Sequence, residues 1–283
     1  MQPFNLNSMY QNGTVKIFEL AGKVIIITGG TGVIGSSFVK ALGHAGAKMV
    51  IIGRKEDVGS QLVDEVKQDG GEAIFIKCDV LNKEDLYAAA EEVIATYGRI
   101  DALVNAAGGN VAGAVINPED DIFEMNLDAM HDVFELNLFG TIMPTVIFGK
   151  YMAKQGGSIV NISSMASQKA ITRVLGYSMA KAGVDNFTKW MSVELAKRYQ
   201  GRVRINAIAP GFFVTTQNKH LLVKEDGSYT ARGEAVIRNT PYQRFGDPSE
   251  LNGTLIWLLS SASGFVSGEI ICVDGGFNVF SGV

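Results

Sequence analysis

Short apolar runs alternate along this chain with longer segments in which apolar residues recur every three or four positions. A continuous apolar run is typical of a parallel strand covered on both faces, and the longer spacing is typical of an amphipathic helix. The predicted strands are residues 23–30, 48–53, 72–80, 99–109, 157–163, 202–210 and 268–276. This alternation predicts an α/β fold, a Rossmann-like doubly wound parallel sheet of about seven strands.

The segments between the strands complete the predicted organisation. The predicted helices are residues 36–46, 56–71, 83–98, 119–155 (interrupted at Gly140 and Pro144), 177–199 and 249–261. Residues 1–18 form a polar, Asn-rich extension, and without a linker the rest, 19–283, is predicted to be a single domain. Residues 217–246 are polar and weakly patterned, which in a compact domain is typical of a lid over a functional site. We call 217–246 the lid segment.

Composition narrows the class of protein. The chain has 283 residues, a net charge of −4 and no long basic run, so neither nucleic acid nor a membrane surface is expected as a partner. The N-terminus lacks the pattern of a signal peptide, and no apolar run approaches the roughly 18 residues of a membrane helix. Cys78 and Cys272 lie in strand-like runs, as reduced cysteines of a cytoplasmic protein do. We predict no metal site.

The first predicted strand leads into the glycine-rich sequence TGGTGVIG, residues 28–35. Glycines let the backbone turn tightly and approach a pyrophosphate, while the next helix offers free amides and the positive end of its dipole. A plain turn between a strand and a helix is the alternative. The position directly after the first apolar strand favours dinucleotide binding.

Tyr177 and Lys181 are four residues apart in a segment without a helix breaker, so a helix would place both on one face. A phenol with a pKa of about 10 is a poor acid or base at neutral pH, and a neighbouring ammonium lowers that pKa. Such a pair can exchange a proton with a carbonyl or alcohol oxygen. Ser164 follows a predicted strand and could hold the same oxygen. Taken alone, a half-buried tyrosine beside a lysine is also an ordinary structural pair.

The end of the second predicted strand bears on the cofactor. NAD-binding folds place an acidic side chain there for the ribose hydroxyls. Here Gly53 is followed by Arg54 and Lys55, two cations that suit the 2′-phosphate of NADP, although Glu56 and Asp57 come next. We therefore predict NADP(H) as the preferred cofactor and NAD(H) as the alternative.

Together, several motifs over residues 19–283 resemble the classical short-chain dehydrogenase/reductase family. These motifs are TGGTGVIG, CDV, VNAAGG, the asparagine of ELNLFG, NISS, YSMAK, APGFFVT and VDGG. The sequence departs from the family twice: the second glycine of TGxxxGxG is Val33 here, and the family's NNAG begins Asn105-Ala106. The resemblance implies an NAD(P)-dependent oxidoreductase that acts on CH–OH groups.

The same resemblance implies roles for individual residues. Tyr177 is expected to be the acid/base, Lys181 to lower its pKa and bind the ribose, and Ser164 to orient the substrate oxygen. Asn137 is expected to hold a water in a proton relay, unless it is a helix-interior asparagine bonded to nearby backbone. The expected cofactor-binding residues are Gly29, Thr31, Gly32, Val33, Ile34, Arg54, Lys55, Asp79, Val80, Asn105, Ala106, Ala107, Gly108, Tyr177, Lys181, Pro210, Gly211, Phe213 and Thr215.

Three of these cofactor residues have more specific expected tasks. Asp79 is expected to contact the adenine, and Asn105 to stabilise the turn after the fourth strand. Thr215, with the backbone around Phe213, is expected to hold the carboxamide of the nicotinamide. The nicotinamide carries the hydride chemistry, and the protein supplies orientation and electrostatics.

Within the family, the sequence most resembles the D-mannonate oxidoreductases of the short-chain type, also called fructuronate reductases. The motifs are AAGGN, NLFGT, NISSMA, APGFFVT, the C-terminal GGFNVFSGV and an arginine four residues before the tyrosine. They imply a sugar-acid substrate, D-mannonate or D-fructuronate, whose carboxylate Arg173 could bind in a bidentate manner. The expected substrate residues are Asn110, Ser164, Arg173, Tyr177, Gln217 and Asn218. The polar and basic residues expected around them include Lys169, Lys219 and His220. For any one of the lid residues, plain solvation is the alternative.

Three other functions stay open. Gluconate 5-dehydrogenase and 3-oxoacyl-carrier-protein reductase are alternative ketoreductases, and the latter would want a basic docking patch that the net acidity does not suggest. A non-catalytic dinucleotide-sensing module is the distant alternative, and the intact Ser164, Tyr177 and Lys181 count against it. We also expect a homotetramer, because the helices at about 120–153 and 177–199 carry more apolar and small residues than one sheet face can cover.

Overall fold

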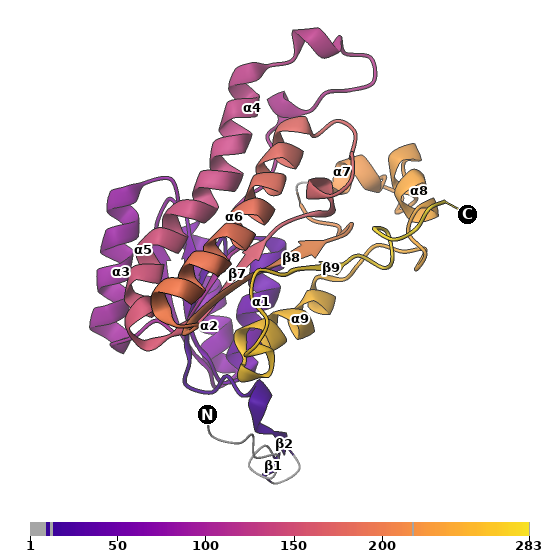
Figure 1. Cartoon of the computed structure of the whole chain (residues 1–283). Coiled ribbons are helices and arrows are strands. Elements are labelled where there is room, and N and C mark those ends of the chain that lie inside the picture. Colours follow the sequence, from indigo (N-terminus) through magenta and orange to yellow (C-terminus); the bar gives the residue numbers. More distant parts are fainter. Residues whose placement is uncertain (1–9, 12–13, 217, 283) are drawn as a thin grey trace.

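The structure, a computed structural model, describes residues 10–11, 14–216 and 218–282. Seven parallel strands form one sheet in the order β5-β4-β3-β6-β7-β8-β9 (Figure 1). These strands are β3 (Val24–Thr28), β4 (Lys48–Gly53), β5 (Glu72–Lys77), β6 (Ala102–Asn105), β7 (Gly157–Ile162), β8 (Val203–Pro210) and β9 (Ile270–Val273). The predicted Rossmann-like parallel sheet is confirmed.

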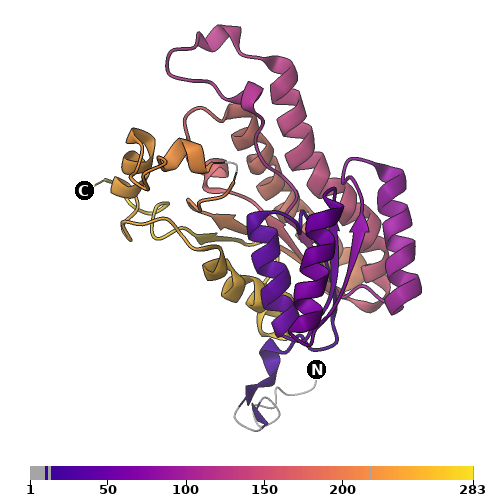
Figure 2. The ribbon, with the colours of Figure 1, turned by 180° about the vertical axis from the view of Figure 1, so that it is seen from behind.

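Helices cover both faces of this sheet (Figures 1 and 2). One layer is α1 (Val33–His44), α2 (Glu56–Gln68) and α9 (Asn252–Leu259), and the other is α3 (Lys83–Tyr97), α5 (Gly140–Gln155) and α6 (Leu175–Tyr199). Successive side chains of a strand point to opposite faces, so Ile25 and Ile27 pack in the first layer and Val24 and Ile26 in the second. Burial on both faces explains why the first apolar run has no polar position.

The strand order reverses beside β3. From β3 the chain runs outward through β4 and β5, then returns to β6 on the other side of β3. Where the order reverses, the loops at the carboxyl ends of the strands diverge and leave a crevice, which is where open α/β sheets bind ligands. The glycine turn after β3 and the loop after β6 both lie at this position.

The helical region predicted at 119–155 differs from the prediction at its start and at its interruption. Residues 119–126 hold only a short turn, η4 (Ile122–Glu124), and α4 (Leu127–Phe134) begins after Asn126, whose side chain caps Ala129 N at 3.0 Å. The interruption is a π-helical turn, η5 (Glu135–Phe139), that continues into α5, with Pro144 inside that helix. The periodicity overlooked the cap, so the predicted start was too early.

The described part of the lid segment forms two short helices, α7 (Lys219–Leu222) and α8 (Ala231–Arg238). The Thr230 hydroxyl donates to Leu221 O at 2.7 Å and ties the two together. At the other end, a small hairpin pairs β1 (Tyr10–Gln11) with β2 (Thr14–Val15) inside the predicted extension of residues 1–18. None of the helices in the described residues has the length and apolarity to cross a membrane.

Candidate active site

Ser164, Tyr177 and Lys181 meet at the carboxyl end of β7. Ser164 follows that strand and caps the short turn η6 (Met165–Ser167), and the Tyr177 side chain hydrogen-bonds to it from the first turn of α6. Lys181, one turn further along α6, is only 4% exposed and its Nζ donates to Ile162 O at 2.8 Å. The same Nζ lies 5.6 Å from the centre of the Tyr177 ring. The fold therefore brings together the three side chains that the sequence singled out.

Burial sets the proton affinities of this group. Burial lowers the pKa of Lys181 to about 8, while the carboxylate of Asp185 opposes that shift. Burial also raises the pKa of Tyr177, and the hydrogen bond from Ser164 acts in the opposite direction. The expected lowering of the Tyr177 pKa by Lys181 is thus not found in this structure: desolvation of the phenol is the larger effect.

A buried carboxyl group, which the sequence analysis overlooked, lies behind the lysine. Asp185 is one helical turn beyond Lys181, is 8% exposed, and accepts a hydrogen bond from the Ser163 hydroxyl. Burial raises its pKa, and hydrogen bonds from Ser163 and Ser167 lower it. The spacing of four residues on α6 was a signal that could have identified it, since such residues share a helix face.

Asn137 ties the π-helical turn to the loop after β6. Its Nδ2 donates to Gly109 O at 2.6 Å and to Val133 O at 2.7 Å, and its Oδ1 accepts from Gly109 N at 3.0 Å. These are the backbone contacts of the structural alternative, and a relay role for Asn137 stays a prediction. A Cβ at Gly108 would lie 2.6 Å from the Asn137 Oδ1 and 3.4 Å from Lys181 Nζ, so this loop passes directly over the lysine.

Asn105 faces the sheet centre rather than the crevice. Its Nδ2 donates to Thr145 Oγ1 and to Asn161 Oδ1, both at 2.8 Å, and Asn161 in turn donates to Thr188 Oγ1 at 2.9 Å. This buried chain of polar groups joins β6 and β7 to α5 and α6. Asn105 therefore joins the end of β6 to β7 and α5 through bonds that the sequence did not indicate, and its expected role in the cofactor site stays a prediction.

The glycine turn fits a dinucleotide. Gly29 has a φ of +65°, and a Cβ there would lie 2.7 Å from Ala106 O and Ala107 N, so the loops after β3 and β6 touch through backbone alone. Gly35 has no room for a Cβ against Gly29 either. Helix α1 starts at Val33 after Gly32, and no side chain caps it, so its first amides are available to a phosphate.

At the far end of this crevice, Arg54 and Asp79 follow β4 and β5. Their side chains lie 3.8 Å apart, and that of Arg54 is 73% exposed. Asp79 also accepts a bond from Leu81 N at 3.0 Å, which fixes its carboxyl group. Glu56 points elsewhere, because its carboxylate lies 3.7 Å from Lys77. Lys55 precedes α2 as its N-cap residue and is exposed.

The loop after β8 positions further predicted cofactor residues. Pro210 ends β8, and Gly211 N donates to Val273 O at 2.9 Å, which fixes the start of the next loop. Within that loop, Thr215 N donates to the Asn218 side chain at 2.7 Å, and Phe213 O accepts from it at 2.8 Å. Asn218 thus braces the loop rather than facing the crevice with a free amide.

The remaining predicted substrate residues are placed as follows. Asn110 follows the loop over Lys181, and its buried Oδ1 has no hydrogen-bond partner among the described residues. Arg173 has a left-handed backbone, φ +76°, and its carbonyl accepts from Ile116 N at 3.0 Å. Gln217 lies outside the described residues. The surrounding polar residues Lys169, Lys219 and His220 are exposed. Among the predicted cofactor residues, Val80 is buried and Thr31 lies against Gly53.

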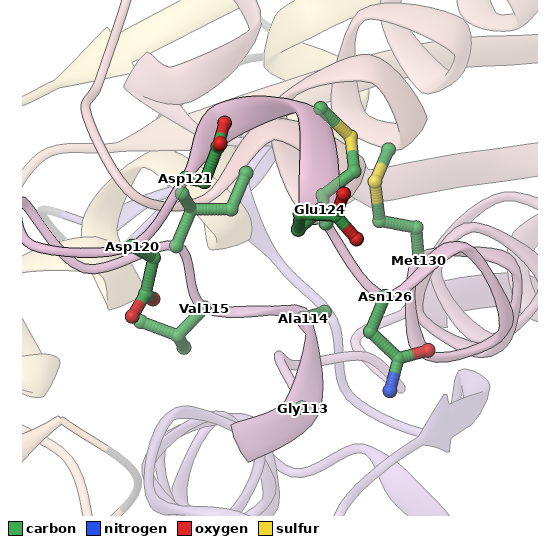
Figure 3. A pocket seen from close by; sticks show the side chains of 10 residues that line it. Gly113, Ala114, Val115, Asp120, Asp121, Glu124, Asn126 and Met130 are labelled. Atoms are coloured by element: carbon green, nitrogen blue, oxygen red, sulfur yellow. The ribbon is translucent and has the colours of Figure 1, made fainter.

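A cavity of about 300 Å³ lies between residues 113–116 and the start of α4 (Figure 3). Its walls are residues 113–116, 120, 121, 124–126 and 130, and none of these is a predicted site residue. Asp120 and Asp121 bond to Asn117 N and Phe123 N, so their carboxylates are engaged in local turns. The acidic lining makes this cavity a poor place for an acid substrate.

A second cavity, of about 460 Å³, lies at the carboxyl ends of β8 and β9. It is lined by Phe212, Phe213, Thr240, Tyr242, Arg244, Gly246, Glu250 and residues 272–276. Arg244 is paired there with Glu250, with Nη2 and Oε1 2.6 Å apart, so the cavity offers no free positive charge from that residue. Phe213 is the one predicted cofactor residue in its lining.

A family model described as enoyl-(acyl carrier protein) reductase matches residues 31–278 of this chain. The chain belongs to the short-chain dehydrogenase/reductase family. This membership confirms the predicted enzyme class, an oxidoreductase that acts on hydroxyl or keto groups with a nicotinamide cofactor.

Individual members of the family resemble the chain over nearly its whole length. An uncharacterized oxidoreductase, UxuB, of Bacillus subtilis is 41% identical over 94% of this chain and 98% of its own. A Haemophilus influenzae protein named as a candidate D-mannonate oxidoreductase, solved with bound NAD, has a TM-score of 0.87 and 38% identity over 94% and 98% of the two chains. A gluconate 5-dehydrogenase of Burkholderia cenocepacia, solved with NADP and tartrate, has a TM-score of 0.82 and 32% identity over 94% and 98%.

Proposed function

We propose that this protein transfers a hydride between NADP(H) and a hydroxyl or keto group of a sugar acid, with D-mannonate and D-fructuronate as the pair to test first. The observation that carries the proposal is the position of Arg173. It lies four residues before Tyr177, in the segment that joins the Ser164 turn to the start of α6. A cation there can bind a carboxylate while the reacting carbon lies beside Tyr177.

The catalytic roles follow from the arrangement. Ser164 and Tyr177 are hydrogen-bonded, so a substrate oxygen can bind to both hydroxyl groups at once. Tyr177 donates its proton to the keto oxygen during reduction and removes the hydroxyl proton during oxidation. The bound nicotinamide supplies or accepts the hydride. Lys181, positively charged below a pKa of about 8, offers donors for a ribose hydroxyl.

The remaining site roles are proposed on the same basis. Gly29, Gly32, Val33 and Ile34 would hold the pyrophosphate at the N-terminus of α1, and Thr215 the carboxamide. Asn137 would shape the loop over Lys181, and this loop could hold a relay water. Asn110 supports a polyhydroxy substrate, since its buried and unpartnered Oδ1 can accept a bond from a substrate hydroxyl.

The preference for NADP(H) rests on Arg54. Its largely exposed guanidinium at the end of β4 can bind a 2′-phosphate, and Gly53 offers no side-chain acceptor for ribose hydroxyls. The carboxylate of Glu56 is directed at Lys77, which supports the same choice. NAD(H) stays the alternative cofactor, because the candidate D-mannonate oxidoreductase of Haemophilus influenzae binds NAD.

A homotetramer is part of the proposal. Large apolar side chains on α5 and α6 are exposed in the single chain, among them Val146 (59%), Met179 (50%), Trp190 (61%) and Val193 (50%). Surfaces of this kind are typical of subunit contacts. Pairing of these helices between copies of the chain would cover them.

Sugar acids fit the site better than acyl carriers do. The family model that matches this chain bears the name of an acyl-carrier reductase. A docking surface for an acidic carrier protein needs clustered cations, however, and the net charge of this chain is −4. The test is initial-rate turnover of D-mannonate, D-gluconate and an acetoacetyl thioester with both nucleotides. Turnover of a hexonate supports the proposal, and turnover of the thioester alone would contradict it.

A further inference from the structure

The lid segment contributes an arginine that the sequence analysis did not single out. Arg232, in the first turn of α8, points its guanidinium at the segment before α6: Nη1 lies 3.3 Å from Thr172 Oγ1, and Nη2 lies 3.2 Å from Thr172 O. Thr172 is the neighbour of Arg173. The lid segment is thereby joined to the part of the chain that leads into Tyr177.

The two guanidinium groups of Arg232 and Arg173 act on one another. The pKa of Arg232 is lowered by burial and, in addition, by the positive charge of Arg173. Two cations that repel one another raise the free energy of the folded chain unless an anion binds between or beside them. The ion pairs of the described residues use other arginines, Arg54, Arg99, Arg198 and Arg244.

The position of Arg232 within α8 adds to this cost. It is the second residue of the helix, directly after the Thr230 cap, where the helix dipole presents its positive end. A cation there is unfavourable, whereas an acidic residue would stabilise the helix. Helix stability therefore does not explain an arginine at this position, and an anion bound beside it would.

The backbone at Arg173 is also held in an unfavourable conformation. A φ of +76° is unfavourable for a residue with a Cβ, because the side chain crowds the backbone in this left-handed conformation. The bond from Ile116 N to its carbonyl holds this conformation and connects it to the loop that carries Asn110. Arg173 is thus fixed between the loop after β6 on one side and α8 on the other.

We propose that Arg173 and Arg232 together form the binding site for the substrate's carboxylate, and that Arg232 makes the enzyme specific for acids over neutral polyols. This inference rests on the proposed function, because it places the acid group of a sugar acid. Guanidinium groups bind carboxylates through paired N–H donors. The Thr172 hydroxyl, already in contact with Arg232, orients that guanidinium.

The test compares D-mannonate with D-mannitol, its neutral six-carbon counterpart, in the full-length enzyme. For Arg232→Gln we expect kcat/KM for D-mannonate to fall about ten- to a hundredfold, the effect of losing one charge-assisted bond, and kcat/KM for D-mannitol to stay within about twofold. Arg238→Gln is the matched control: it removes the same charge from the exposed last turn of α8 and should leave both values nearly unchanged. An equal loss on both substrates, or no loss, would overturn the inference.

A binding measurement separates this inference from the proposed function. Calorimetric titration of D-mannonate, D-mannitol and inorganic phosphate is carried out on the parent, Arg232→Gln and Arg232→Lys. We expect D-mannonate to bind the parent, to bind the lysine variant more weakly and the glutamine variant at least tenfold more weakly. Binding that depends on Arg232 without any turnover would keep the inference and refute the proposed function. Turnover combined with D-mannonate binding that does not depend on Arg232 would refute the inference and keep the proposed function. Phosphate binding as tightly as D-mannonate would overturn the carboxylate assignment.

Discussion

Lys181 allows the balance between catalysis and stability to be measured. The pKa of the buried ammonium is about 8, against 10.5 for an unburied lysine. At about 1.4 kcal/mol per pKa unit, holding the charge inside the fold at neutral pH costs about 3 kcal/mol. Lys181→Met keeps the length of the side chain and removes the charge. It also removes the bond to Ile162 O, worth about 1 kcal/mol, so the variant should be about 2 kcal/mol more stable at pH 7.

The pH dependence of this gain has a definite sign. Between pH 8 and 10.5 the unfolded parent holds more protons than the folded parent, so the stability of the parent rises with pH. The methionine variant lacks this rise. Its advantage should therefore be full below pH 8 and shrink through this window, until above pH 10.5 only the lost hydrogen bond remains and the parent is the more stable.

Urea unfolding at pH 7 and at pH 10 measures both quantities. Lys197→Met, an exposed lysine near the end of the same helix, is the control and should change stability by less than about 0.5 kcal/mol at either pH. The methionine variant should also be inactive. A loss of stability at pH 7, or a gain that is the same at both pH values, would refute the conclusion that the fold holds Lys181 as a strained charge for catalysis.

Three further predictions concern the tuning of the site, the cofactor and the assembly. The carboxylate of Asp185 raises the pKa of Lys181, so Asp185→Asn should lower that pKa below about 8. The decrease of kcat/KM for the cofactor at high pH should then occur at lower pH, and an unchanged pH profile of kcat/KM would contradict this. Arg54→Asp should reverse a preference for NADP(H) in steady-state kinetics. A higher kcat/KM of the parent for NAD(H) than for NADP(H) would show that another group binds the ribose hydroxyls. Light scattering at micromolar concentration should give the mass of four chains, and a monomer would refute the tetramer.

The sheet could be predicted from the sequence because its strands are rich in apolar residues, most clearly in the continuous apolar runs 24–27 of β3 and 49–52 of β4. The glycine turn and the Tyr177–Lys181 pair could also be predicted from the sequence, since both depend on local spacing. The start of α4 could not, because the cap at Asn126 overrides periodicity. The contact of Arg232 with Thr172 could not be predicted either, because only the tertiary fold creates it. The spacing from Lys181 could have identified Asp185, but its contact with Ser163 could not be predicted. The net direction of the Tyr177 pKa likewise depends on burial, which spacing does not report.

The most direct test of the central claim is the rate of D-fructuronate reduction by the parent and by Tyr177→Phe, with cofactor binding measured alongside by nucleotide fluorescence. The phenylalanine variant keeps the ring and loses only the hydroxyl that bonds to Ser164. We predict rapid reduction by the parent, a loss of at least a hundredfold in the variant, and cofactor affinities within about twofold of one another. Activity of the variant within tenfold of the parent would contradict the assignment of Tyr177 as the proton donor.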